Sequence, residues 1–227
     1  MRKILILLFA LFLSANLFAQ DDNLIAPLND DFKDIDTVKV GQKFHNIHMI
    51  GVKYGYTLAT VSSSPSLHEG YIQAPYNFSL LYTCYHAMWD YMPYFGFQTG
   101  IKYGEEGYSS DLDGYGERYK KVEIPLIAQF KIDFSRFRIL ANLGTYYGYR
   151  LSTDKEGGFD RYDIRNDYGI IGGAGFAVIF EPLEFQIEAN YQYSLCSVYH
   201  TNKMSDMYWL IAYPRNILIS FGVFIHL

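Results

Sequence analysis

The sequence predicts an all-β protein, an eight-stranded antiparallel up-and-down transmembrane β-barrel with long outer loops and short periplasmic turns. The stretch Tyr119–Phe134 alternates between an apolar face and a mostly polar face, as a strand with lipid on one side does. Similar stretches recur along the chain, and the connections between them alternate between long and short. Aromatic residues make up 18% of the chain, which favours strands and membrane interfaces.

The N-terminus has the pattern of a secretory signal peptide over residues 1–19. Arg2 and Lys3 form a positively charged start, residues 4–13 are an apolar core, and Leu17-Phe18-Ala19 is a plausible cleavage site. The alternative is a retained transmembrane anchor, but the apolar run is short for one. We therefore expect export and cleavage.

Residues 20–43 are predicted to be an acidic periplasmic N-terminal segment, and the barrel is predicted over residues 44–227. The acidic segment lacks sustained periodicity, so we expect a flexible tail, with a docking segment for a partner as the alternative. Cleavage of the signal peptide removes two positive charges and takes the formal net charge from −5 to −7. Binding of nucleic acid requires a basic face, so no nucleic-acid partner is expected.

The first half of the barrel follows from three alternating segments before the stretch described above. Loops are expected at residues 62–75 and 104–118, because Ser, Pro and Gly accumulate there, and a short turn is expected around residues 87–90. The three predicted strands are about His45–Val61, Tyr76–His86 and Tyr91–Tyr103.

The fourth strand, Tyr119–Phe134, has the clearest two faces. Proline has no N–H to donate to a neighbouring strand, so Pro125 predicts a bulge or a missing ladder bond at that point. The predicted outward row is Val122, Ile124, Leu126, Ala128, Phe130 and Ile132, and the inward row is Glu123, Pro125, Ile127, Gln129 and Lys131.

The second half of the barrel continues the same alternation of strands and connections. Tight turns are expected at Ser135 and at Glu181-Pro182, and long loops at residues 152–167 and 197–212. The remaining strands are predicted at about residues 137–150, 168–180, 185–194 and 216–227. Four glycines in the segment 168–180 leave its face assignment open. Eight strands with both ends in the periplasm give four long loops and three short turns, as counted here.

Several of these strands resemble the PorT-like family of outer-membrane β-barrel proteins. The segment VEIPLIAQFKI at 122–132 is similar to the Leu-Glu-Ile-Pro-Leu strand of that family, and further similar patches are LGTYYGYRLS at 143–152, DYGIIGGAGF at 167–176 and FQIEANYQYSL at 185–195. In the last patch, Asn190 and Ser194 stand where a basic residue and a glycine are expected. The resemblance implies an outer-membrane location and a non-enzymatic role in envelope assembly or protein secretion.

The inward rows predict a polar network in the lumen, formed by Lys53, Glu123, Arg138, Arg150 and Glu188. An eight-stranded barrel is wide enough only for its own side chains or one small ligand. Because unpaired buried charge is costly, we expect paired charges that plug the lumen, with a transport site as the alternative. We expect the two glutamates to pair with basic residues among the other three. The barrel is expected to be monomeric, with outer-membrane lipid around it and envelope or secretion-system proteins as candidate partners.

A different class of function is a lipid-modifying or ligand-carrying barrel. The last loop offers His200, Ser197 or Ser205, and Asp206 for such chemistry, but their spacing does not distinguish them from ordinary loop residues. The sequence has no nucleophile elbow and no phosphate loop, and its six histidines lack metal-ligand spacing. We therefore expect neither an enzyme, nor a metal site, nor a cofactor.

The two cysteines provide a test of the strand directions. Export favours a disulfide between Cys84 and Cys196, but the predicted topology puts Cys84 near the periplasmic end and Cys196 near the outer rim. About 25 Å of apolar band separates these two ends, whereas a disulfide needs Cα atoms within about 7 Å. We predict two free thiols, with Cys84 facing lipid and Cys196 more accessible.

Overall fold

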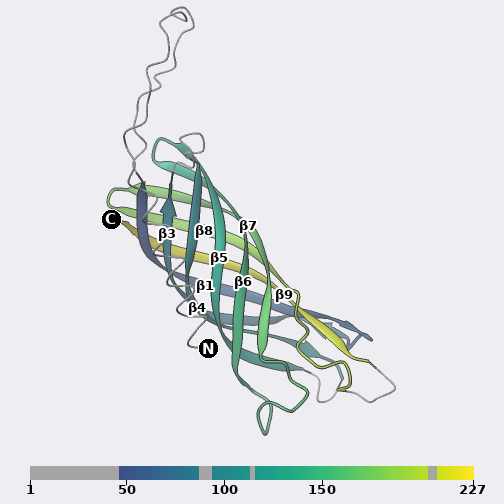
Figure 1. Cartoon of the computed structure of the whole chain (residues 1–227). Helices are drawn as coiled ribbons and strands as arrows, with labels where there is room; N and C mark the ends of the chain where they lie inside the picture. The colour runs from purple at the N-terminus through teal and green to yellow at the C-terminus, as the bar shows by residue number, and fades with distance from the viewer. Residues whose placement is uncertain (1–45, 87–93, 113–115, 204–208) are drawn as a thin grey trace, which may run out of the picture. The chain divides into compact units, whose positions relative to one another are not determined.

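The computed structural model describes residues 46–86, 94–112, 116–203 and 209–227. None of these residues belongs to a helix with the length and apolarity needed to cross a membrane. Long strands wind around a barrel in strongly tilted paths (Figure 1). They are β1 (Ile47–Ser64), β3 (Ile72–Tyr85), β4 (Phe95–Ser110), β5 (Glu117–Phe134), β6 (Phe137–Thr153), β7 (Asn166–Phe180), β8 (Leu183–Ser194) and β9 (Ile211–His226); β2 (Glu69–Gly70) is a two-residue strand beside β4.

The long strands pair in a closed antiparallel ring. Each pairs with its neighbour in the chain, and β1 pairs with β9 from Met49↔His226 to Ser64↔Ile211. This last pairing joins the two ends of the sheet, so the predicted eight-stranded barrel is confirmed. We call the end with the connections 154–165 and 195–210 the outer end, and the end with the two-residue turns 135–136 and 181–182 the periplasmic end.

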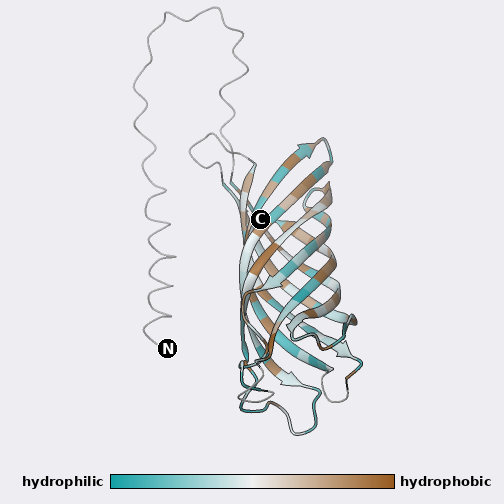
Figure 2. Ribbon diagram, turned by 90° about the vertical axis from the view of Figure 1, so that its right-hand side faces the viewer, coloured by the Kyte–Doolittle hydropathy of each residue, from teal (hydrophilic) through white to brown (hydrophobic). Residues whose placement is uncertain are grey.

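The barrel carries apolar side chains outside and polar side chains inside. On β5, residues from Glu123 to Lys131 alternate between buried and exposed or half-buried positions, and the inward set is the one predicted. Hydrophobic and hydrophilic residues alternate in short segments along the strands (Figure 2). Ile124, Leu126 and Phe130 of β5 are all exposed. An exposed apolar band around a buried polar interior is the pattern of an outer-membrane barrel, in which the outside faces lipid.

The strands reach further at the outer end than the sequence predicted. Residues 104–110 were expected in a loop, but they belong to β4 and pair with β5 as far as Tyr108↔Glu117. Likewise, residues 62–64 belong to β1 and residues 72–75 to β3. Beyond the apolar band the outward face no longer needs apolar side chains, so the apolar alternation that marks a membrane strand is lost there.

Pro125 interrupts one of its two ladders, as predicted. Pairing between β4 and β5 stops after Thr99↔Leu126 and resumes at Lys102↔Glu123, whereas the ladder to β6 runs through Pro125↔Tyr146. On β7, where the sequence left the faces open, Asp167 and Ile171 are buried and face inward. The signal peptide, the acidic segment and the expected turn at residues 87–90 lie outside the described residues.

Candidate functional site

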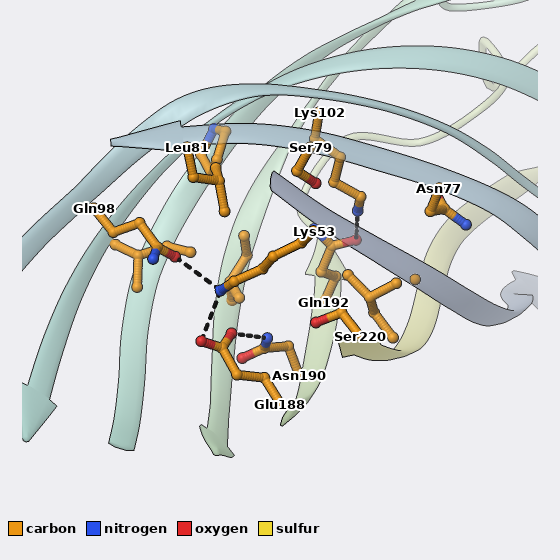
Figure 3. A pocket seen from close by; sticks show the side chains of 15 residues that line it. Lys53, Asn77, Ser79, Leu81, Gln98, Lys102, Glu188, Asn190, Gln192 and Ser220 are labelled. Carbon is orange, nitrogen blue, oxygen red and sulfur yellow. Dashed lines mark hydrogen bonds and ion pairs between the residues drawn. The ribbon is translucent and has the colours of Figure 1, made fainter. Parts of the chain in front are cut away.

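The middle of the barrel interior is organised by an ion pair between β1 and β8, the two strands that flank β9. Lys53 of β1 places its Nζ 2.6 Å from Oε1 of Glu188 on β8 and donates a hydrogen bond of 3.3 Å to Gln98 Oε1 (Figure 3). The other carboxylate oxygen of Glu188 accepts hydrogen bonds of 3.0 Å from Asn142 and from Asn190. Both charges are therefore satisfied without water or solute.

A glycine makes the space that Lys53 occupies. Gly222 of β9 lies directly opposite Lys53 in the β1–β9 ladder. A Cβ at position 222 would lie 2.6 Å from Lys53 Cγ, well inside van der Waals contact. The glycine thus lets a long side chain lie along the wall and reach across to Glu188.

Nearer the outer end, three carboxylates surround one ammonium group. Lys121 Nζ lies 2.6 Å from Glu123 Oε1, 2.7 Å from Asp167 Oδ2 and in ion-pair contact with Glu106. Arg150 binds the same group of acids, with its Nε 2.9 Å from Glu106 Oε1 and its Nη2 3.6 Å from Asp167 Oδ1. We call these five residues the acidic cluster.

Lys102 completes the charge balance of this cluster. Its Nζ lies 2.7 Å from Glu123 Oε2 and donates a hydrogen bond of 3.1 Å to Gln192 Oε1. Three cations therefore face three carboxylates. The carboxylates of Glu106, Glu123 and Asp167 lie within 4.8 Å of one another, as in a metal site. The ammonium of Lys121 already contacts all three, and so takes the place that a bound cation would occupy.

A third group of charges lies at the periplasmic end. Arg138 of β6 places Nε 2.6 Å from Asp133 Oδ1 and Nη1 2.6 Å from Glu184 Oε2. Glu184 also contacts His226 Nε2 at 3.0 Å, and Lys131 lies 3.1 Å from Asp133. The guanidinium of Arg138 is thus held by acids from two different strands.

The structure places the five predicted lumen residues inside the barrel, in three separate groups. Lys53 and Glu188 contact each other, Glu123 and Arg150 belong to the acidic cluster, and Arg138 lies at the periplasmic end. One expected pairing is wrong: Glu123 pairs with Lys102 and Lys121 rather than with Lys53, Arg138 or Arg150. Partner choice depends on how far each strand is shifted along its neighbours, which a single strand does not reveal.

Sequence reasoning missed the residue at the centre of the acidic cluster. Lys121 lies two residues before Glu123, so the period-two pattern of that strand already put both on the inward row. Glu106 and Asp167 were missed because both fell in segments predicted as loops, whereas they lie on the extended ends of β4 and β7.

The packed interior leaves little free volume. A cavity of about 40 Å³ lies beside the Lys53–Glu188 pair, lined also by Gln98, Lys102 and Pro125 (Figure 3). By a measure in which one water needs roughly 10–15 Å³, this volume accommodates only a few waters.

The outer end is covered by the described part of the last long loop, residues 195–203 and 209–210. Tyr199 turns into the barrel, where its hydroxyl lies 2.7 Å from that of Tyr108 and 3.1 Å from that of Tyr119. Burial raises the pKa of Tyr199, and the nearby Tyr108 phenol raises it further, so the group stays neutral. Buried apolar side chains pack around these rings, among them Val198 and Leu210.

A second long loop, residues 154–165, holds this closure in place. The backbone N–H of Ile164 donates to Val198 O at 2.7 Å, and that of His200 donates to Tyr162 O at 2.8 Å. Lys203 places Nζ 2.7 Å from Asp163 Oδ1. The two loops therefore form one hydrogen-bonded cover over the lumen.

The candidate catalytic residues of the last loop are only partly described. His200 is exposed, and Ser197 Oγ accepts hydrogen bonds from the N–H groups of Tyr199 at 3.2 Å and Ala212 at 3.1 Å. Ser205 and Asp206 lie outside the described residues. Ser197 therefore stabilises the turn that carries Tyr199.

The two cysteines are free, as the strand directions predicted. Cys84 lies near the periplasmic end of β3, opposite His48 and on the same side of the strand as Tyr82. Cys196 follows β8 at the outer end, and both thiols are half-buried.

Among solved structures, the chain is similar to Neisserial surface protein A (NspA), with 17% identity over 78% of this chain and 96% of that chain and a TM-score of 0.48. It is also similar to Ail, the attachment invasion locus protein of Yersinia pestis, solved in complex with the heparin analogue sucrose octasulfate (16% identity, 78% and 99% of the chains, TM-score 0.43). A major outer membrane protein from Thermus thermophilus gives 13% identity over 79% and 99% of the chains, with a TM-score of 0.48. No protein-family model matches the chain, and no curated protein matches it.

Proposed function

We propose that this protein is a non-enzymatic outer-membrane barrel that acts by binding other proteins of the envelope. One observation carries the proposal: the interior is filled by paired charges and closed at the outer end by Tyr199. In the part of the chain that the structure describes, such an interior offers a solute neither an open path nor an unpaired charge to bind. The surfaces left for function are the loops and the N-terminal segment.

The resemblance to the PorT-like family supports a specific form of this function, in envelope assembly or protein secretion. The patches that carry it, such as residues 122–132 and 143–152, lie in β5 and β6. These strands build the wall of the barrel and do not select a partner. The acidic segment 20–43 is our candidate for binding a periplasmic partner, because in the sequence it directly precedes β1, which begins at the periplasmic end of the barrel.

Affinity purification from detergent-solubilised membranes tests the proposal. A tag inserted between Gly157 and Gly158 lies in an exposed loop, where an added side-chain atom would meet nothing within 4 Å. We expect envelope proteins to co-purify with the full chain after mild cross-linking, and to be lost when residues 20–43 are deleted.

The control is an unrelated eight-stranded barrel tagged in an outer loop and produced at the same level. If the two barrels retain the same set of proteins, partner binding by this chain is contradicted. If a specific set survives deletion of residues 20–43, the partner binds the loops, which substitutions of exposed residues such as Arg161 would then locate.

A further inference from the structure

A groove of about 390 Å³ lies on the outside of the barrel, at the outer ends of β1, β8 and β9. Its floor comes from outward-facing residues of these strands, and its cover comes from the loop between β1 and β3. The lining includes Thr60, Ser62, Tyr71, Tyr191, Arg215 and Ile217. The interior network does not involve this groove.

Strand register places the groove directly above the apolar band. Ile217 lies between Leu58 and Tyr191 on its two neighbouring strands, and this row ends the outward apolar run of β9. Arg215 is the next outward residue, about 7 Å further along the strand, between Thr60 and Tyr193. In a bilayer whose hydrocarbon core matches this apolar band, a cation facing outward at this level would meet the headgroups of the outer leaflet.

The guanidinium of Arg215 is positioned but not neutralised within the described part of the chain. Its Cζ lies 5.5 Å from the ring centroid of Tyr193. Its Nε is buried and has no hydrogen-bond partner among the residues that the structure describes. A half-buried guanidinium whose own buried N–H has no acceptor is destabilising unless an anion binds to it.

Glu69 forms part of the opposite wall and is already held by its own loop. Its Oε1 accepts hydrogen bonds from the Ser63 N–H at 2.8 Å and from the Ser63 hydroxyl, and its Oε2 accepts one from Ser66 at 3.2 Å. Burial alone would raise the pKa of Glu69, but the hydrogen bonds, that from Ser63 foremost, lower it to about 2. This carboxylate therefore orders the loop that covers the groove and remains an acceptor for hydroxyl groups.

We propose that this groove binds the headgroup of a phosphorylated glycolipid of the outer leaflet. Its phosphate lies at Arg215, which offers a planar fork of donors matched to phosphate oxygens. Its sugar hydroxyls meet Ser62 and Glu69, and its sugar ring packs against Tyr71 and Tyr191. The acyl chains continue down over the exposed apolar side chains of Ile217 and Ile219. The occupant is a membrane lipid because the groove opens directly above the lipid-facing band.

The test measures lipid binding by the purified barrel in a detergent without sugar groups. Native mass spectrometry is used with lipid A, a diphosphorylated and acylated glucosamine disaccharide, and with its dephosphorylated form. We expect Arg215→Gln to weaken lipid A binding roughly tenfold, as the loss of a hydrogen-bonded charge pair does. Arg215→Lys should weaken lipid A binding less than Arg215→Gln does, because lysine keeps the positive charge although it lacks the planar set of donors. The wild type should bind dephosphorylated lipid A more weakly than lipid A, whereas Arg215→Gln should bind both forms equally.

The matched control is Arg118→Gln, the same change at the outer end on β5, where Glu105 already pairs with the arginine at 3.4 Å. Lipid A binding by this variant should equal that of the wild type. If Arg215→Gln binds lipid A as tightly as the wild type, the proposal is overturned. It is also overturned if inorganic phosphate at equal concentration displaces lipid A from the wild type, because the site would then be one for a free anion. If Arg215→Gln does not fold, Arg215→Lys carries the test with both lipids. No protein partner is involved, so the outcome is separate from that of the purification experiment.

Discussion

Lys121 is the residue on which the charge balance of the upper interior depends most. Its ammonium contacts Glu106, Glu123 and Asp167, and all four side chains are almost completely buried. Arg150 and Lys102 alone cannot neutralise three carboxylates. The stability of this region therefore comes less from any single pair than from a complete network, in which removal of one member leaves buried charge uncompensated.

We predict that Lys121→Met strongly destabilises the barrel. Breaking a buried ion pair from one side typically costs about 3–5 kcal/mol, because the remaining charge stays buried. The measurement is urea-induced unfolding in detergent or lipid vesicles, followed by the change in gel mobility between folded and unfolded barrel.

The neighbouring lysine supplies the control for this experiment. Lys120 is exposed on the outer side of the same strand, so Lys120→Met makes the same chemical change without affecting the interior. We expect it to change stability by less than about 0.5 kcal/mol. Equal unfolding curves for the two variants would mean that the acidic cluster contributes nothing to stability.

At the scale of elements, glycines decide how closely neighbouring strands approach. Gly144 of β6 faces inward, and a Cβ there would collide with the carbonyl oxygen of Leu126 and lie 2.7 Å from Ile127 Cα. Gly172 lies in the adjacent ladder on β7, where the nearest heavy atom to an added Cβ is Asn142 O at 4.0 Å. The two glycines are close in space but have different roles.

We predict that Gly144→Ala destabilises the barrel and that Gly172→Ala does not. The first change forces backbone atoms of β5 and β6 apart, and overpacking of this kind typically costs about 1–3 kcal/mol. The second adds a methyl group in open space on a strand, where alanine is conformationally less costly than glycine. Folding yields and unfolding midpoints of the two variants provide the comparison. If Gly172→Ala lost more stability than Gly144→Ala, the close approach of β5 to β6 at Gly144 would be contradicted.

At the scale of the whole molecule, the barrel is a closed cylinder with three layers of paired charge. The layers centre on Arg138, on Lys53 with Glu188, and on Lys121, and the hydrogen-bonded rings around Tyr199 cover the outer end. Among the described residues, the cavity of about 40 Å³ beside Lys53 and Glu188 has room for only a few waters. The filled interior therefore argues against a pore and leaves the loops as the surface available for binding.

We predict that the purified protein gives no stable conductance steps in planar lipid bilayers. The double variant Lys53→Ala/Glu188→Ala removes the central pair together, which avoids an unpaired charge and leaves a wider interior. It should conduct more than the wild type, although Tyr199 still limits the flow. Large, stable steps from the wild type would contradict the filled interior.

The sequence by itself determined the fold class and the two faces of the strands. On β5, Ile124 and Leu126 point outward and Glu123 inward, because successive side chains of any strand alternate regardless of what surrounds it. The directions of the strands followed from counting long and short connections, and they correctly separated Cys84 from Cys196. These properties depend on residues that are neighbours in the chain.

Only the tertiary structure decided which groups meet. Lys53 and Glu188, or Arg215 and the loop that carries Glu69, come together through the stagger between strands and the path of a loop. A shift of one residue in register would turn every side chain of a strand to the other face, and a shift of two would change every partner. A two-residue shift leaves the inward and outward faces of a strand unchanged. The sequence therefore shows that a charged side chain points inward, whereas the pairing of the strands in the closed ring determines which partner it meets.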